Sequence, residues 1–338
     1  MRLLITTPYF SPSLGGMETV AECLATEFVT LGHEVTVATA TIEDDGRAHP
    51  FSVLRSPNLV TLVKESLRAD AILQHQISLR LGLPALVLRR PTVIAHHMWT
   101  PRIGPGAGLG RLKHALLRLA DNVAVSSAMA SSLAVPCAII PNPYQEQAFT
   151  GPCPTTPKRD LVFLGRLEEG KGLKVLLQAL ALLAAHNLRP TLTVIGSGPS
   201  EDLHRRQTVE LGLTAQVEFT GSLRGDALRD RLTAHHLLIV PSVWEEAFGV
   251  VVLEGLACGL VPVVSDSGGL PEAVGKCGVV VPKGNADSLA AAIQQLLKTE
   301  ASRRPYHDCS AEHLAAHAPA RIAKRYLEAL AHSRRTPR

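Results

Sequence analysis

Aromatic residues are scarce in this sequence, and several patterns that mark whole classes of protein are missing. Phe, Trp and Tyr make up 4% of the 338 residues, so any core must be aliphatic. None of the six cysteines forms a C-x-x-C pair or joins a Cys/His cluster with zinc spacing. We therefore interpret the cysteines as small core residues of a protein in a reducing compartment.

Long apolar runs are missing too. No stretch reaches about 18 uninterrupted apolar residues, the length that a membrane-spanning helix needs. The first apolar run, residues 3–5, is far too short for a signal peptide. The net charge of +4 is too small to indicate a nucleic-acid-binding protein. We expect a cytoplasmic protein with no nucleic-acid partner.

Short apolar runs alternate with helical patterns along the chain, which predicts parallel sheets covered by helices. The Pro- and Gly-rich residues 150–159 indicate a linker between two such series. We predict an α/β protein with two doubly wound, Rossmann-like domains, 1–150 and 158–310, that face a central cleft. A C-terminal helix at 311–332 can pack back on the first domain. The expected strands are 3–7, 34–40, 70–73, 91–95, 122–126 and 138–140 in the first domain, and 160–164, 191–195, 217–220, 237–240, 261–265 and 279–281 in the second.

The loop at residues 165–172, GRLEEGKG, follows an expected strand and precedes an expected helix. Gly165 permits a tight backbone path, and the helix start offers N–H groups that have no partner within the helix. Arg166 and Lys171 add two positive charges, so the loop can seat a diphosphate. It lacks the spacing of a Walker A loop. The alternative is two surface cations in an ordinary strand-to-helix loop.

Two carboxylates, Glu246 and Glu254, flank a largely apolar segment. Eight residues of helix turn through about 800°, which would place both side chains on roughly the same helix face. Carboxylates accept hydrogen bonds from neighbouring sugar hydroxyls. The alternative is one carboxylate favoured by the helix dipole and one solvated Glu, although the apolar neighbours of Glu254 argue against solvation.

Two weaker signals occur in the first half of the sequence. Gly15 and Gly16 join the first strand to the first helix, where a backbone can approach a ligand closely. His96 and His97 end the strand expected at 91–95. Each feature can also be purely structural, and two histidines alone cannot make a zinc site.

In order along the chain, these motifs resemble the retaining glycosyltransferase family 4, which has the GT-B fold. The resemblance covers nearly the whole chain. Besides the two motifs at 165–172 and 246–254, it includes P-x-x-G-G-x-E at 12–18, I-P-N-P at 140–143, G-x-G-P at 196–199 and S-G-G-L-P-E at 267–272.

The resemblance implies a role for each matching residue. Arg166 and Lys171 would bind the diphosphate of a nucleotide-sugar donor. Glu246 would hold hydroxyls of the transferred sugar, and Glu254 the ribose. His97, rather than His96, would contact the donor sugar near the reacting carbon. The remaining donor-binding residues would be Gly16, at the first helix's N-terminus, Gly165, Gly198, Phe248, Gly249 and Val250.

The resemblance also implies the reaction. A UDP-, GDP- or ADP-sugar would transfer its sugar to a glycan or lipid-linked acceptor with retention at the anomeric carbon. We expect no cofactor and no metal, because no Asp-x-Asp motif is present and two cations can stabilise the leaving diphosphate. Residues 40–115 carry no family-wide motif, so the acceptor cannot be inferred.

Three other functions remain open. A nicotinamide-dependent oxidoreductase would need G-x-G-x-x-G after the first strand, and the sequence lacks it there. A GT-B sugar-nucleotide epimerase and a non-catalytic sugar-nucleotide-binding subunit both fit the architecture. Separately, residues 80–118 contain seven Arg or Lys and no Asp or Glu, and 110–120 read as a short basic amphipathic helix. This stretch could touch the inner membrane face, be a solvated basic surface, or contact an acidic acceptor.

Overall fold

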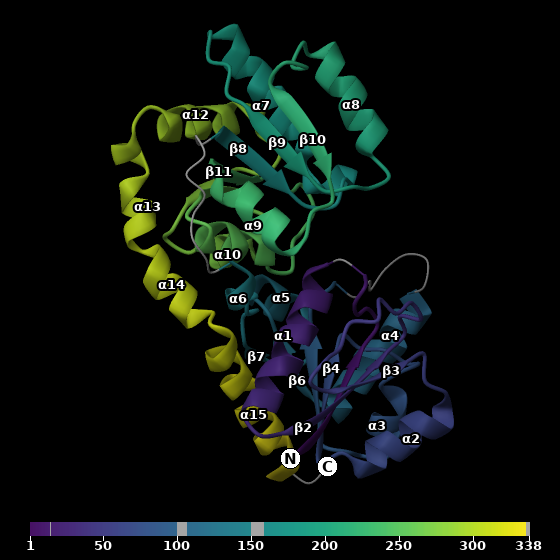
Figure 1. Cartoon of the computed structure of the whole chain (residues 1–338). Helices are drawn as coiled ribbons and strands as arrows, with labels where there is room; N and C mark the ends of the chain where they lie inside the picture. The colour runs from purple at the N-terminus through teal and green to yellow at the C-terminus, as the bar shows by residue number, and fades with distance from the viewer. Residues whose placement is uncertain (14, 100–106, 150–158, 336–338) are drawn as a thin grey trace. The chain divides into compact units, whose positions relative to one another are not determined.

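The computed structural model describes residues 1–13, 15–99, 107–149 and 159–335. The chain forms two compact units: unit 1 comprises Met1–Gln145 and His317–Arg338, and unit 2 comprises Glu146–Ala316 (Figure 1). The linker expected at 150–159 lies almost wholly outside the described residues.

Unit 1 is built on a parallel sheet whose described strands have the order β3-β2-β1-β4-β5-β6-β7. The order reverses between β1 and β4, which makes this pair the switch point of the sheet. The strands are β1 (Arg2–Thr7), β2 (Glu34–Thr39), β3 (Ser52–Arg55), β4 (Ala71–His75), β5 (Thr92–His96), β6 (Asp121–Ala124) and β7 (Ala138–Ile139).

Helices of unit 1 cover this sheet because their apolar residues recur at helical spacing. Leu4 and Ile72 of the sheet pack with Leu62 and Ala85 in one aliphatic cluster. The helices are α1 (Gly16–Thr30), α2 (Leu59–Arg68), α3 (Leu83–Val87), α4 (Ala107–Leu116), η1 (Leu117–Leu119), α5 (Ser127–Ser132) and α15 (Pro319–Arg335).

Unit 2 holds a second parallel sheet, with the order β10-β9-β8-β11-β12-β13 among its described strands. Here the order reverses between β8 and β11. The strands are β8 (Arg159–Leu164), β9 (Leu192–Ile195), β10 (Val217–Gly221), β11 (His235–Val240), β12 (Val261–Ser265) and β13 (Val279–Val281). The helices are α6 (Glu146–Phe149), η2 (Glu169–Lys171), α7 (Leu173–Ala185), α8 (Glu201–Glu210), α9 (Gly225–Thr233), α10 (Val250–Ala257), α11 (Leu270–Val274), α12 (Ala286–Leu297), η3 (Glu300–Ser302), α13 (Arg304–Asp308) and α14 (Ser310–Ala316).

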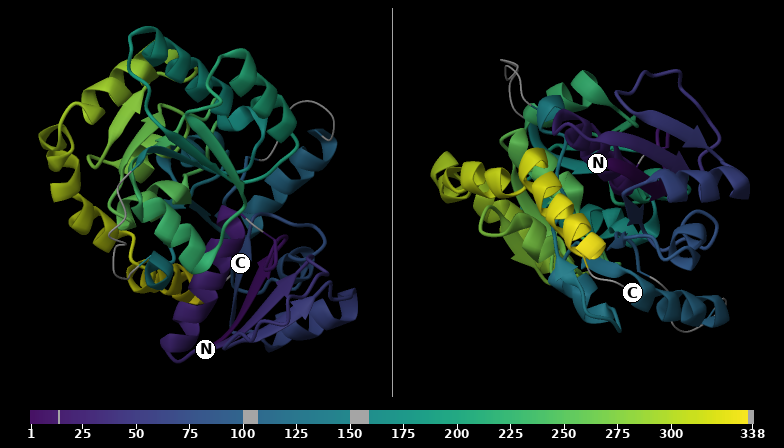
Figure 2. Two further views of the ribbon diagram at one scale, coloured as in Figure 1. Left: turned by 45° about the horizontal axis from the view of Figure 1, so that its top comes forward. Right: turned by 90° about the horizontal axis from the view of Figure 1, so that it is seen from below.

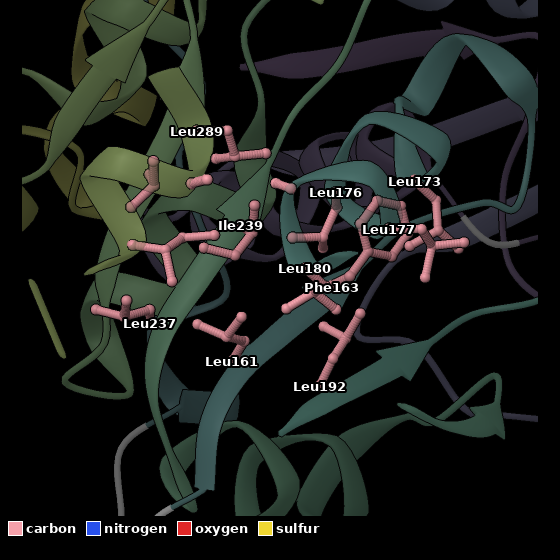
Figure 3. Packing of buried hydrophobic residues seen from close by; sticks show 14 of the residues in the cluster. Leu161, Phe163, Leu173, Leu176, Leu177, Leu180, Leu192, Leu237, Ile239 and Leu289 are labelled. Atoms are coloured by element: carbon pink, nitrogen blue, oxygen red, sulfur yellow. The ribbon is translucent and has the colours of Figure 1, made fainter. Parts of the chain in front are cut away.

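The core of unit 2 is aliphatic, as the low aromatic content requires. Leu161 and Ile239 of the sheet meet Leu176 and Leu180 of α7 in one buried cluster, with Phe163 among them (Figure 3). Leu238 points to the opposite face, since side chains alternate along a strand, and there it contacts Gly255 of α10. Helices therefore cover both faces of this sheet.

The single C-terminal helix expected at 311–332 is instead two helices, α14 and α15. Pro319 starts α15, and the residue before a proline avoids the helical region, so the helix cannot run through. Only α15 belongs to unit 1, where it packs against α1, β4 and β5. Figure 2 shows the yellow last helix beside the purple first one. Its buried stripe consists of Ile322, Ala323, Tyr326 and Leu330.

The interpretation of all six cysteines as small core residues is wrong for one pair. Cys277 and Cys309 form a disulfide, with their Cα atoms 5.7 Å apart. Their 32-residue separation gave no signal in the sequence because α12 and α13 lie between them and return the chain to the same place. Cys23, Cys137 and Cys258 form no disulfide with another described residue, and Cys153 lies outside the described residues.

Among the described helices, none is long and apolar enough to cross a membrane.

Candidate functional site

The candidate site lies at the switch point of the unit 2 sheet. The loop after β8, residues 165–172, and the loop after β11, residues 241–249, leave the carboxyl ends of two neighbouring strands. After these loops, the chain continues to β9 on one side and to β12 on the other side of the sheet. At such a point the two loops diverge from neighbouring strand ends and leave room for a ligand between them. Two motifs that are far apart in the sequence therefore meet here.

An ion pair joins the two loops. Lys171 Nζ lies 2.7 Å from Oε1 of Glu246. The hydroxyl of Ser242 donates to the same oxygen, also at 2.7 Å. Both side chains keep some exposure, 32% for Lys171 and 17% for Glu246, so a ligand can reach them. A cation and a carboxylate with free acceptor capacity thus stand side by side.

Backbone contacts fix the two loops to each other. The carbonyl oxygen of Gly170 accepts hydrogen bonds from the N–H groups of Val243, at 2.9 Å, and Trp244, at 3.1 Å. Gly172 has φ of +76°, and a Cβ there would overlap the carbonyl oxygen of Pro241. A Cβ at Gly170 would overlap the indole ring of Trp244. The Gly-Lys-Gly sequence is needed here because the neighbouring loop leaves no room for side chains on either side of Lys171.

Arg166 stands on the same loop, and it is the more exposed cation. Its Nη2 lies 2.6 Å from Oε1 of Glu168, with 64% of the side chain exposed. The backbone on either side is anchored to the turn after β9: Gly165 N–H donates to Ile195, and Leu167 N–H to Ser197. A Cβ at Gly198 would overlap the backbone of Leu167. Gly198 thus lets the turn after β9 support the Arg166 loop.

The carboxylates Glu246 and Glu254 do not share a helix face, contrary to the prediction. Helix α10 begins only at Val250, because Gly249 takes a left-handed conformation with φ of +104°. Glu246 therefore lies in the loop before the helix, where its carbonyl oxygen accepts from Gly269 N–H at 2.8 Å. The assumption of eight continuous helical residues was the error.

Glu254 lies in the second turn of α10 among apolar neighbours. Burial raises the pKa of its carboxyl from 4.5 to about 7, because the charged form loses its water. Among the described residues, no hydrogen-bond partner offsets this loss. Phe248 and Val250 are buried beside Gly249 at the start of the helix, whose first N–H groups have no partner within it. This helix end can attract an anion or a polar ligand.

The remaining predicted residues belong to unit 1. Gly16 begins α1, which follows β1 after the loop at residues 8–15. His96 is fully buried, and its Nε2 lies 3.0 Å from Oδ1 of Asn122, a structural contact within the sheet. His97 Nε2 lies 2.9 Å from Nδ1 of His75. The roles of Gly16 and His97 stay predictions.

Sequence reasoning missed Ser242, Trp244 and His75. Ser242 lies within the recognised P-S-x-x-E segment, so its position four residues before Glu246 was a usable signal. His75 ends β4 as His96 ends β5, but the strand had been expected to stop at residue 73.

No group of three or more His, Cys, Asp or Glu that could hold a metal occurs among the residues that the structure describes.

Comparison with known families decides the identity of this unit. Residues 151–311 match the family described as glycosyl transferases group 1. Unit 2 matches the glycosyl transferases group 1 family over most of its length. The prediction of a glycosyltransferase relationship is confirmed, and membership of family 4 is consistent with it.

Curated relatives match the same part of the chain. An uncharacterized glycosyltransferase of Methanocaldococcus jannaschii is 35% identical over 140 residues, which are 40% of this chain and 35% of that protein. D-inositol 3-phosphate glycosyltransferase of Corynebacterium jeikeium is 38% identical over 144 residues, 40% of this chain and 34% of that protein. The match thus spans about a third of the length of these relatives.

Solved structures resemble the whole chain. Sucrose-phosphate synthase from Thermosynechococcus elongatus has a TM-score of 0.80 at 19% identity, with 97% of each chain covered. Anabaena HepE in complex with UDP and glucose has a TM-score of 0.80 at 19% identity, covering 98% of this chain and 99% of that one. These likenesses confirm the predicted fold class: α/β, of GT-B type, with two Rossmann-like domains.

Proposed function

We propose that the protein is a retaining glycosyltransferase that moves a sugar from a nucleotide-diphosphate sugar to an acceptor hydroxyl. The observation that carries the proposal is the Lys171–Glu246 pair at the switch point of a glycosyl transferases group 1 domain. Relatives and structural neighbours support it, since they include a transferase named for GDP-mannose and a structure bound to UDP-glucose.

The charges of this pair suit both parts of such a donor. A leaving diphosphate gains negative charge as the glycosidic bond breaks, and Lys171 and Arg166 would stabilise it. Glu246 can then accept hydrogen bonds from hydroxyls of the sugar. Donor binding would therefore replace the Lys171–Glu246 contact with one partner for each: phosphate for the amine and hydroxyl for the carboxylate.

We propose that the reaction needs no metal and no cofactor, because two side-chain cations perform the charge stabilisation. The acceptor oxygen would attack on the face that the diphosphate leaves, and the leaving phosphate oxygen would take its proton. The transferred sugar would thereby keep its anomeric configuration. Glu254 would hold the ribose, where hydroxyl donors satisfy the desolvated carboxyl.

The acceptor would be a glycan or a lipid-linked molecule, reached at the cytoplasmic side of a membrane. In the described part of residues 80–118, Arg111 and Leu112 lie exposed on α4, with Arg118 and Leu119 exposed just after it. Exposed basic and apolar side chains close together in the chain suit an anionic bilayer. Flotation with anionic liposomes at low salt tests this contact, and failure to float would contradict it.

The transferase is tested by incubation with labelled UDP-, GDP- and ADP-sugars, followed by separation of free sugar and nucleotide. Slow hydrolysis of one donor, with release of its nucleoside diphosphate, is expected of a transferase without its acceptor. An epimerase would change the sugar configuration instead, and a binding subunit would release nothing. Glu246→Gln should keep the fold and donor binding but lower turnover strongly, since its contacts matter most in the transition state.

A further inference from the structure

Two buried histidines meet at the carboxyl ends of β4 and β5 in unit 1. Nδ1 of His75 lies 2.9 Å from Nε2 of His97, and the two rings stack with their centroids 4.8 Å apart. His75 is fully buried and His97 is 8% exposed. The next residue, Gln76, holds the backbone here: its Oε1 accepts from the N–H groups of His97 and Met98.

Both rings are uncharged near neutral pH. Burial lowers the pKa of His75 to about 3 and the pKa of His97 well below its ordinary value. A neutral imidazole has one N–H and one acceptor nitrogen. In a bond between two such rings, one must donate and the other accept, so the donor's identity fixes both tautomers.

The two remaining ring nitrogens, Nε2 of His75 and Nδ1 of His97, are buried without a hydrogen-bond partner among the described residues. If His97 donated, the N–H of His75 Nε2 would be left unpaired in the fully buried interior. If His75 donates, the unpaired N–H falls on Nδ1 of His97, the ring nearer the surface. Each arrangement leaves one N–H and one acceptor nitrogen unpaired. The second is favoured because it places the N–H on His97, where an acceptor is near: the Asn142 side chain acts on His97 in the direction that raises its pKa, as an oxygen that faces an N–H does.

We infer that His75 is a positioning residue, which donates from Nδ1 to Nε2 of His97 and so holds His97 as the Nδ1–H tautomer. Under this arrangement, His97 carries its N–H at Nδ1, a buried nitrogen that a hydroxyl or carbonyl oxygen of a substrate would reach by displacing the atoms that cover it. Oδ1 of Asn142, in the I-P-N-P segment, is also buried without a partner. The Asn142 side chain acts on His97 in the direction that raises its pKa, which places it near the same ring. The contribution to turnover rests on the proposed function; the tautomer does not.

Histidine ¹⁵N NMR of the full chain tests the tautomer directly. The chain has 14 histidines, so the spectrum of His97→Gln is needed to assign the His97 signals. In the wild type, His97 should show a protonated Nδ1 and an unprotonated Nε2. The opposite pattern would overturn the inference, whether or not the protein has transferase activity.

Two substitutions of the same residue separate positioning from packing. His75→Phe keeps a stacked ring but removes the donor, whereas His75→Asn keeps an N–H donor close to the position of Nδ1. We expect His75→Phe to lose the Nδ1–H tautomer of His97 and to lower kcat roughly 10- to 100-fold, the range for partners that orient metal-bound histidines. His75→Asn should restore the tautomer and most of the turnover, with the donor KM little changed in both variants.

A buried histidine of unit 2 is the matched control. His235 bonds to Thr193 and to the carbonyl of Arg231, so His235→Asn perturbs a core in a similar way. It should leave the His97 signals unchanged.

Wild-type turnover in His75→Phe would overturn the positioning role. An inactive wild type would refute the proposed function, and the NMR pattern would still decide the tautomer. If His75→Phe fails to fold, the wild-type and His75→Asn spectra give that decision.

Discussion

Lys171 and Ser242 both bind Oε1 of Glu246, so neither uses the second carboxylate oxygen. This arrangement keeps the amine in place before a donor arrives and leaves the carboxylate able to accept further hydrogen bonds. Arg166 pairs with Glu168 on its own loop and remains mostly exposed. The two cations therefore differ. Lys171 is held between the two loops by Glu246, whereas the exposed Arg166 can leave Glu168 to bind a phosphate.

Removal of either cation should damage catalysis more than folding. Lys171→Ala and Arg166→Ala should each lower kcat by about 10²- to 10³-fold, the usual loss for one stabiliser of transition-state charge. Lys174→Ala, an exposed cation of α7, is the control and should keep full activity. Circular dichroism checks the fold, and the wild type should stay active in excess EDTA. Full activity in both alanine variants, or complete loss with EDTA, would contradict the proposed diphosphate site.

Glu254 links the site to the stability of the fold. Its pKa is raised from 4.5 to about 7 in the folded chain, so the folded state binds a proton more tightly than the unfolded state. The contribution of this carboxyl to stability is then greatest below pH 4.5 and falls as the pH rises towards 7. At about 1.4 kcal/mol for each pKa unit, the loss has an upper limit of about 3.5 kcal/mol.

Glu254→Gln should remove this dependence, because the amide stays neutral. Urea denaturation should show little difference from the wild type at pH 4.5 and a more stable variant at pH 8. Glu210→Gln, at an exposed position on α8, should show no such divergence. Parallel stability curves for Glu254→Gln and the wild type would mean that the carboxyl is hydrated in solution.

At the scale of elements, the loop after β8 is fixed by a contact that only glycine allows. Gly172 and Gly212 both have positive φ, +76° and +68°, but a Cβ at Gly212 would meet nothing within 4 Å. Gly212→Ala should therefore cost only the left-handed backbone term, about 1–2 kcal/mol. Gly172→Ala adds an overlap with Pro241 and should cost on the order of 3 kcal/mol or more, as well as turnover. Equal losses of unfolding free energy would contradict this account.

The sequence was most informative where strands are buried on both faces. In unit 2, the strand expected at 261–265 has those bounds in the structure and is buried at every position, because a continuous β-branched run suits a central parallel strand. The strand expected at 279–281 also has its bounds, although it lies at the edge of the sheet and Val280 is exposed. The strand β3 was missed: it is a half-buried edge strand of four residues with no clear apolar run. The error at Glu246 arose because residues between a strand and a helix carry no periodicity to read.

For the candidate site, single residues were predicted from the sequence, and the contacts between them were not. Lys171 and Glu246 were identified separately by their motifs, and the ion pair between them depends on the strand order, which local patterns do not determine. The His75–His97 pair escaped for the same reason, since it joins the ends of two neighbouring strands. Contacts across a sheet are a property of topology rather than of spacing.

At the scale of the whole molecule, helix α15 completes unit 1 although it follows unit 2 in the chain. Tyr326 is its largest fully buried side chain, and its hydroxyl has no hydrogen-bond partner among the described residues. Tyr326→Phe should therefore be neutral or slightly stabilising, since it removes an unsatisfied polar atom. Tyr326→Ala should lower the unfolding free energy by about 3–5 kcal/mol through the cavity it leaves. A thermal denaturation series would check both, and a marked loss with Phe would indicate that the hydroxyl is bonded in solution.

The late position of α15 also sets an order of events during synthesis. A ribosome makes the sheet of unit 1 first, then all of unit 2, and only afterwards residues 317–338. At about 5–20 residues per second, the strands of unit 1 would wait on the order of ten seconds or more for their covering helix. The unit that is made second can therefore finish folding first, and the face around β4 and β5 stays uncovered on the nascent chain, where chaperones would be expected to bind.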